Sequence, residues 1–99
     1  LKPNVDRAKA LLEEFAIEDL QMVGSITLGG TTWALIKDTN GAVHRVSMGD
    51  HMGLDYGEIV GLSSHGIEVE EIISDGRGGW IKRPRYVELQ QAALNGEQK

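Results

Sequence analysis

The segment TTWALIKDTNGAVHRVSM, residues 31–48, decides the fold of this 99-residue chain. Residues 31–37 and 42–48 carry β-branched and aromatic side chains, as strands do. Between them, Asn40 and Gly41 form a pair that accepts the positive φ angles of a primed hairpin turn. The segment therefore predicts two antiparallel strands joined at this turn. Trp33 lies in phase with Leu35, and we expect its ring to pack in the core.

The strand pattern continues on both sides of this hairpin. Further strands are predicted over residues 20–28, 56–63, 67–73 and 80–89, separated by glycine-containing turns. In the first of these strands, the residues expected to share one face are Leu20, Met22, Ile26 and Leu28. In residues 67–73 the alternation slips at Glu71 and Ile72, as a β-bulge would cause. Six to seven short strands predict an all-β fold, a small β-sandwich or partly open barrel.

The two ends of the chain follow different patterns. Ala8, Leu11, Leu12 and Phe15 have helical spacing and predict a short N-terminal helix from about residue 5 to residue 15. The predicted organisation is a linker with this helix over residues 1–18, a β-sandwich domain over 19–89 and a polar C-terminal tail over 90–99. Because the chain begins with Leu1 rather than Met, we expect it to be part of a longer protein.

The composition excludes several classes of protein. The chain has no cysteine, which excludes a disulfide framework, a thiolate zinc site and a cysteine nucleophile. The formal net charge of −5 argues against binding of nucleic acid or anionic membrane by the surface as a whole. No apolar run approaches the length of a membrane-spanning helix.

Few residues have the pattern of a catalytic or metal site. Asp50, His51 and Asp55 share one loop and could begin a metal site, but solvated loop side chains explain them more simply. No serine nucleophile elbow or HExxH helix is present. We therefore expect no catalytic residues, no metal site and no cofactor.

Charge is distributed unevenly along the last two predicted strands. Residues 58–75 contain five acids and no Lys or Arg, and residues 77–86 contain four basic residues and no acid. These strands could pair with each other, with the basic residues bonded to Glu68 and Glu70, or form a bipolar surface that docks a protein partner. Trp80 and Tyr86 flank basic residues as in single-stranded nucleic-acid binders, so a small β-barrel of that kind is the alternative function.

Several short blocks carry a more specific signal when they are read in order. They are Leu20–Gly24, Trp33–Ile36, Val43–Val46 with Gly49, Asp50 and Gly53, and Asp75–Trp80. This series resembles the PilP family of type IV pilus biogenesis lipoproteins over roughly residues 19–89. Where that family often has Tyr-Arg-Val, this chain has His44-Arg45-Val46.

The resemblance implies a periplasmic β-sandwich with a non-catalytic role in type IV pilus assembly and twitching motility. It implies two partners, the inner-membrane PilN–PilO complex and the outer-membrane secretin PilQ, and no nucleic acid. It also implies that the full-length protein is tethered to the inner membrane by a lipid anchor upstream of residue 1.

A partner-binding site is expected at two places. A small open sandwich leaves strand edges, which can accept a strand from another protein. The preferred edge is the first strand, at Met22, Val23, Gly24 and Ser25; the alternative is that Gly24 marks a bulge inside the sheet. The preferred electrostatic steering patch consists of the basic residues Arg77, Lys82, Arg83 and Arg85.

Overall fold

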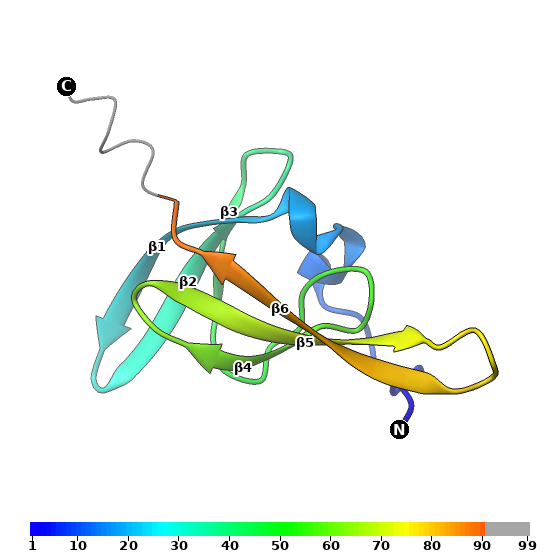
Figure 1. Cartoon of the computed structure of the whole chain (residues 1–99). Helices are drawn as coiled ribbons and strands as arrows, with labels where there is room; N and C mark the ends of the chain where they lie inside the picture. The colour runs from blue at the N-terminus through cyan, green and yellow to red at the C-terminus, as the bar shows by residue number, and fades with distance from the viewer. Residues whose placement is uncertain (91–99) are drawn as a thin grey trace.

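The predicted all-β fold is confirmed. The computed structural model describes residues 1–90, and within them six strands form two three-stranded antiparallel sheets (Figure 1). The first sheet has the order β1 (Gln21–Leu28), β2 (Thr31–Lys37), β3 (Val43–Val46). The second has the order β4 (Glu58–Leu62), β5 (Gly66–Ser74), β6 (Trp80–Glu88). Residues 91–99, most of the predicted polar tail, lie outside the described residues.

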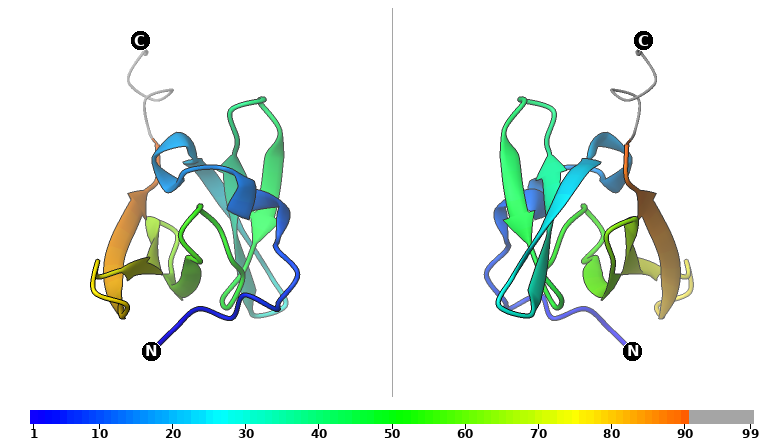
Figure 2. Two further views of the ribbon diagram at one scale, coloured as in Figure 1. Left: turned by 90° about the vertical axis from the view of Figure 1, so that its right-hand side faces the viewer. Right: turned by 90° about the vertical axis from the view of Figure 1, so that its left-hand side faces the viewer.

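The two sheets lie face to face as two layers around one apolar core (Figure 2). The fully buried side chains of the first sheet include Met22, Ala34 and Ile36, and the second sheet contributes Ile59 and Ile67 among others. The sheets join where the end of β6 reaches the start of β1. There Leu89 forms a parallel bridge with Met22, and the Gln90 N–H donates to the Met22 carbonyl at 2.8 Å.

The prediction of an N-terminal α-helix from residue 5 to residue 15 is wrong. The segment instead forms two short 3-10 turns, η1 (Leu11–Glu14) and η2 (Ile17–Asp19). An isolated eleven-residue helix is only marginally stable, and here a more favourable local arrangement competes with it. The Glu13 carboxylate accepts hydrogen bonds from the Ala10 N–H at 2.7 Å and from the Arg7 guanidinium, which fixes the chain in extended form before η1.

The segment before residue 19 also packs more closely than a linker would. Leu12 and Ile17 are buried in the core, and the Gly53 N–H donates to the Leu12 carbonyl at 3.0 Å. The 3-10 turns therefore close one end of the space between the two sheets (Figure 2).

The β2–β3 hairpin forms as predicted, but its turn differs from the predicted primed type. The Gly41 N–H donates to the Asp38 carbonyl at 3.1 Å, and Gly41 alone in this loop has positive φ, at 86°. This is a three-residue loop with a glycine in the left-handed region. Two N–H groups, those of Asn40 and Ala42, donate to the Asp38 carboxylate and hold the loop closed.

Replacing Gly41 by valine tests this turn. A β-branched residue at φ 86° is strained, so we expect the free energy of unfolding to fall by at least about 1 kcal/mol in urea denaturation. A Cβ at Gly41 would meet no atom within 4 Å, so any loss reports backbone conformation rather than crowding. An unchanged denaturation midpoint would contradict the assignment.

The expectation that Ile26 and Leu28 share one face of the strand with Met22 is wrong, because the register shifts within β1. Met22 pairs with Ile36 and Gly24 pairs with Leu35, so Val23 is an extra residue in the strand. Such a bulge reverses the facing of every later side chain. Ile26 and Leu28 consequently lie on the outer face of the sheet, and their side chains are exposed.

Trp33 also lies on that outer face, so the expectation that its ring packs in the core is wrong. It is in phase with Leu35, as predicted, but the two core-facing residues of β2 are Ala34 and Ile36. Trp33 is half-buried, and the Arg45 guanidinium lies 5.1 Å from the centre of its ring.

The predicted β-bulge at Glu71 does not form. β5 and β6 pair without interruption from Gly66 opposite Glu88 to Ser74 opposite Trp80. The alternation is regular, and Glu71 occupies the same buried face as Ile67 and Val69. A carboxylate at a core-facing position therefore explains the apparent slip.

Candidate partner-binding surfaces

The first candidate surface is the outer edge of β1, where the sequence places Met22, Val23, Gly24 and Ser25. The Met22 side chain is fully buried, and its carbonyl already accepts the Gln90 N–H. Val23 is the exposed bulge residue, and Gly24 and Ser25 are half-buried. The part of the edge that faces solvent thus begins after Met22.

The pairing of β1 with β2 determines which backbone groups this edge presents. Gly29 and Gly30 both have positive φ and form a two-residue hairpin loop, so the flanking Leu28 and Thr31 form a hydrogen-bonded pair. Because such pairs alternate along antiparallel strands, Ile26 bonds to β2 while the N–H and C=O groups of Ser25 and Thr27 point away from it. Within residues 1–90, no strand pairs with this side of Ser25 and Thr27.

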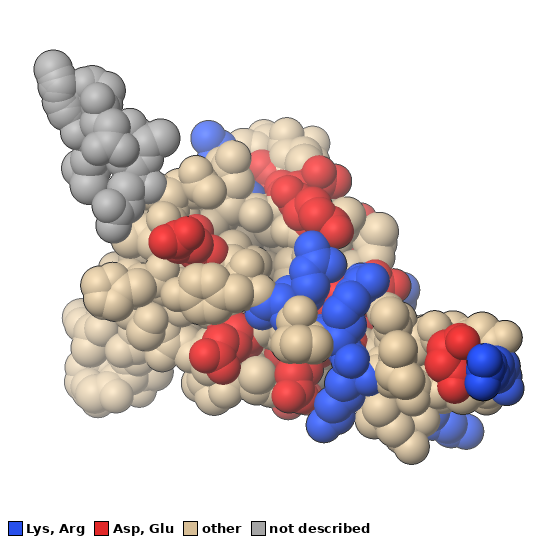
Figure 3. Space-filling view, in the orientation of Figure 1, with Lys and Arg blue, Asp and Glu red and all other residues tan. Residues whose placement is uncertain are grey.

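The second candidate surface is the basic group on β6 and the preceding loop. Lys82 lies 3.5 Å from Glu70, which is one of the two acids expected to pair with it. Glu68, the other expected acid, pairs with none of these basic residues. Figure 3 shows the basic side chains of this face lying directly among acidic ones.

Arg83 and Arg85 hold a network around the buried Glu71 carboxylate. Arg83 lies 2.8 Å from Glu71 and 3.1 Å from Asp55, and Arg85 lies 3.2 Å from Glu71 and 2.9 Å from Glu18. The hydrogen bond from Arg85 lowers the pKa of Glu18, and the same bond raises the pKa of Arg85. The positive charge of these two arginines is therefore largely compensated within the domain.

Arg77 is the exception in this group. It lies in the exposed glycine-rich loop between β5 and β6, and among the described residues its side chain forms no ion pair. The structure thus separates Arg77 from Lys82, Arg83 and Arg85 rather than presenting all four as one uncompensated patch.

The row of basic and aromatic residues on β6 also bears on the nucleic-acid alternative. Single-strand binders use cations that are free to contact phosphate. Here all three basic residues of the strand, Lys82, Arg83 and Arg85, pair with carboxylates, so it does not present the expected row of free cations.

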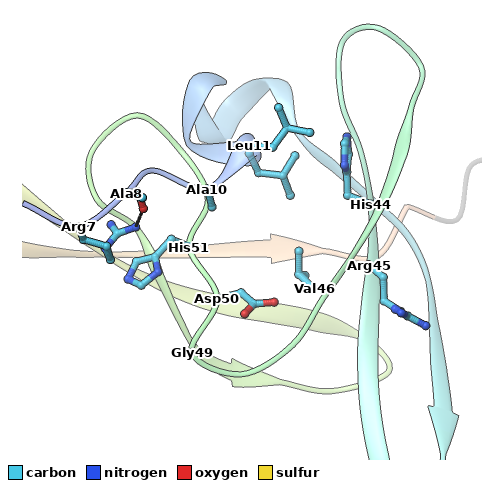
Figure 4. Close-up of a pocket in the computed structure, with 11 residues that line it drawn as sticks. Arg7, Ala8, Ala10, Leu11, His44, Arg45, Val46, Gly49, Asp50 and His51 are labelled. Atoms are coloured by element: carbon cyan, nitrogen blue, oxygen red, sulfur yellow. Dashed lines mark hydrogen bonds between the residues drawn. The ribbon is translucent and has the colours of Figure 1, made fainter.

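A groove of about 440 Å³ lies between the N-terminal segment and the outer edge of β3 (Figure 4). Arg7, Ala8 and Ala10 line one side, and Val46 and the loop with His51 line the other. Two of its charged groups have partners within the chain. Arg7 forms a bidentate ion pair with Glu13 at 2.7–2.8 Å, and Asp50 accepts the Ser47 N–H at 2.8 Å.

The structure does not bring together the loop residues that could begin a metal site. Asp50 caps the turn after β3, whereas Asp55 bonds to Arg83 on β6. Over residues 1–90, no group of three or more His, Asp or Glu side chains is arranged to hold a metal ion. In the same range, no helix is long and apolar enough to cross a membrane.

His44 has a structural partner at the end of the β2–β3 hairpin. Its Nε2 lies 2.7 Å from Asp38 Oδ2, and this bond, together with the Asn40 and Ala42 N–H groups, lowers the pKa of Asp38. The pair joins β3 to the hairpin loop and stabilises the loop.

A third surface, the outer face of the first sheet, was not predicted from the sequence. Ile26 pairs with Trp33, Leu28 with Thr31, and Leu35 with Arg45, so these side chains share one side of the sheet. This face could not be predicted because the bulge at Val23 is not visible in the spacing of the apolar residues. The Gly24 that follows it was the one available signal, since glycine within a strand often marks a bulge.

Comparison with known proteins gives consistent matches. Residues 1–89 match the family model described as "Pilus assembly protein, PilP". The chain is 44% identical over 91 residues to the type IV pilus inner membrane component PilP of Pseudomonas aeruginosa, and it spans about half (52%) of that protein's length.

Solved structures agree with this result. A domain of the type IV pilus biogenesis lipoprotein PilP from Pseudomonas aeruginosa has a TM-score of 0.82 at 45% identity, covering 89% of this chain and all of that one. A domain of the Neisseria meningitidis PilP pilot protein has a TM-score of 0.71 at 31% identity, covering 99% of this chain and 86% of that one.

Proposed function

This chain belongs to the PilP family of pilus assembly proteins, and from that membership we propose that it is a non-catalytic structural adaptor of the type IV pilus machine. In this role it links the inner-membrane PilN–PilO complex to the outer-membrane secretin PilQ. It works in the periplasm, and the full-length protein is tethered to the inner membrane by its lipid anchor.

The observation that carries the proposal is the open edge of β1. Residues 20–36 contain no charged side chain, and the strand has no proline. Natural proteins protect exposed strand edges with charges, proline or covering segments, and an edge that lacks them is a template for another strand. Within residues 1–90 the outward N–H and C=O groups of Ser25 and Thr27 pair with no strand, and they supply the hydrogen bonds for a partner strand.

A proline at Ser25 tests this docking mode. The Ser25 N–H points away from β2, so proline removes a donor to the partner without removing a bond within the sheet. We expect Ser25→Pro to weaken binding to purified periplasmic N-domains of PilQ by at least about tenfold, the loss of a central interface contact. The measurement is a calorimetric titration, with thermal unfolding to show that the fold is intact.

Ser25→Ala is the matched control, because it removes the hydroxyl and keeps the N–H. It should bind as the wild type does. If Ser25→Pro folds and binds equally well, the partner does not add a strand at this edge. If the wild type binds neither PilQ N-domains nor the periplasmic PilN–PilO complex, the adaptor role itself is wrong.

A further inference from the structure

The outer face of the first sheet is unusually apolar for a solvent-facing surface. It is formed by Ile26, Leu28, Trp33, Leu35, Val43 and Arg45. Leu28 is 62% exposed and Val43 is 53% exposed, and Ile26 is also exposed. Contiguous exposed apolar groups on a soluble domain mark an interaction site more often than scattered ones do.

The charge of this face is opposite to that of the domain. The chain as a whole carries −5, yet the charged residues on the outward side of the three strands are only Lys37 and Arg45. The cross-strand pairs place no acid beside them, since Asp38 lies beyond the end of β2 with its carboxylate bonded to His44.

Trp33 and Arg45 give this face a defined centre. The Arg45 guanidinium lies over the Trp33 ring, which holds it in place and leaves its donors free for an acceptor outside the domain. Among the described residues, Arg45 forms no ion pair, in contrast to Arg83 and Arg85. Tryptophan and arginine are the residue types enriched among those that dominate binding energy at interfaces.

We infer that this outer face binds a protein surface that presents carboxylates among apolar side chains, with a carboxylate bonded to Arg45 above Trp33. The inference rests on the proposed adaptor function and deepens it, because it gives the domain a docking face continuous with the β1 edge. A partner strand paired with Ser25 and Thr27 would extend the same sheet and bring its neighbouring side chains beside Ile26 and Leu28.

Two substitutions test the two halves of the inference. Arg45→Glu reverses the charge, and Leu28→Asp places a charge in the apolar part. Both side chains are exposed, so the fold should be kept, as checked by thermal unfolding. Each variant is titrated against purified PilQ N-domains and against periplasmic PilN–PilO. We expect both variants to bind the same one of these two partners at least about tenfold more weakly than the wild type does. Arg45→Glu should also reduce the salt dependence of that binding.

Lys2→Glu is the matched control. It makes the same change in net charge at an exposed position next to the N-terminus, which lies away from the β1–β2 hairpin (Figure 1). It should bind as the wild type does. Wild-type binding that is kept in both Arg45→Glu and Leu28→Asp would overturn the inference while leaving the adaptor role intact, and so would a loss in Lys2→Glu equal to that in Arg45→Glu.

Two further outcomes are decisive. A wild-type dimer in light scattering that Leu28→Asp dissociates would assign the face to a second copy of the chain and overturn the inference. Failure of the wild type to bind either partner would overturn the proposed function, and the inference with it.

Discussion

Replacing Ile36 by alanine is expected to lower the free energy of unfolding by about 2–5 kcal/mol, the usual loss for a large aliphatic side chain removed from a packed core. Ile36 is fully buried at the centre of β2, opposite Met22 on β1 and His44 on β3. The substitution removes several methyl and methylene groups and leaves a cavity between the two sheets. Urea denaturation followed by circular dichroism measures the loss.

Trp33→Ala is the informative comparison. Its ring is larger than the Ile36 side chain, yet it lies half-buried on the outer face beneath Arg45. We expect a loss of only about 1–2 kcal/mol, from the partial burial and the cation–π contact. If Trp33→Ala costs more than Ile36→Ala, the facing of β2 described above is wrong.

These two residues show why the sequence predicted the strands better than their faces. Glycine-containing turns and β-branched runs are local signals, and they placed all six strands to within a few residues. The facing of a strand depends on register, and a single extra residue reverses it. Val23 is such a residue in β1, and the shift between Ile59 and Gly61 in β4 is of the same kind.

Buried charge was the second feature that hydrophobic periodicity could not predict. Glu71 breaks the apolar alternation of β5, and from the spacing alone this break indicates a bulge. Its burial is explained by Arg83, which lies opposite it in the sheet, and by Arg85, which lies opposite Val69 and bonds to both Glu71 and Glu18. Such networks depend on contacts between distant segments, so local spacing does not predict them.

The candidate binding surfaces could be predicted from the sequence only in part, because they too depend on contacts between distant segments. The open edge of β1 could be expected from a small sandwich with an uncharged first strand. The basic residues of β6 stood out in the sequence, but their intramolecular partners did not. Within the described residues all three form ion pairs, and only Arg77 in the preceding loop forms none. The apolar outer face could be recognised only once the register of β1 was known, because the bulge at Val23 decides which side chains face outward.

The N-terminal turns provide the second large effect, through the ion pair of Arg7 with Glu13. Glu13 is 1% exposed, and its carboxylate accepts two bonds from the Arg7 guanidinium and one from the Ala10 N–H. Arg7→Ala leaves this carboxylate buried without a cation. Removing one partner of a buried pair costs about 3–5 kcal/mol, and because Arg7 is itself partly exposed we expect a loss near 3 kcal/mol at pH 7.

The size of this loss should depend on pH in a definite direction. In the wild type the bond from Arg7 lowers the pKa of Glu13 below its ordinary value of 4.5. That pair therefore stabilises the fold above about pH 4.5, and the stabilisation is lost as the pH falls through the folded pKa. In Arg7→Ala, burial without a cation raises the pKa of Glu13, so the variant is destabilised as the pH rises through and above 4.5.

The difference in unfolding free energy between wild type and Arg7→Ala should thus be largest at neutral pH and shrink on acidification. Urea denaturation of both proteins between about pH 7 and pH 4 measures this difference, and changes in other groups cancel in the comparison. The double variant Arg7→Ala/Glu13→Gln removes the titrating group and should lose the pH dependence relative to Glu13→Gln alone. A wild-type-to-variant difference that stays constant across this range would mean that Glu13 does not carry its charge into the folded state.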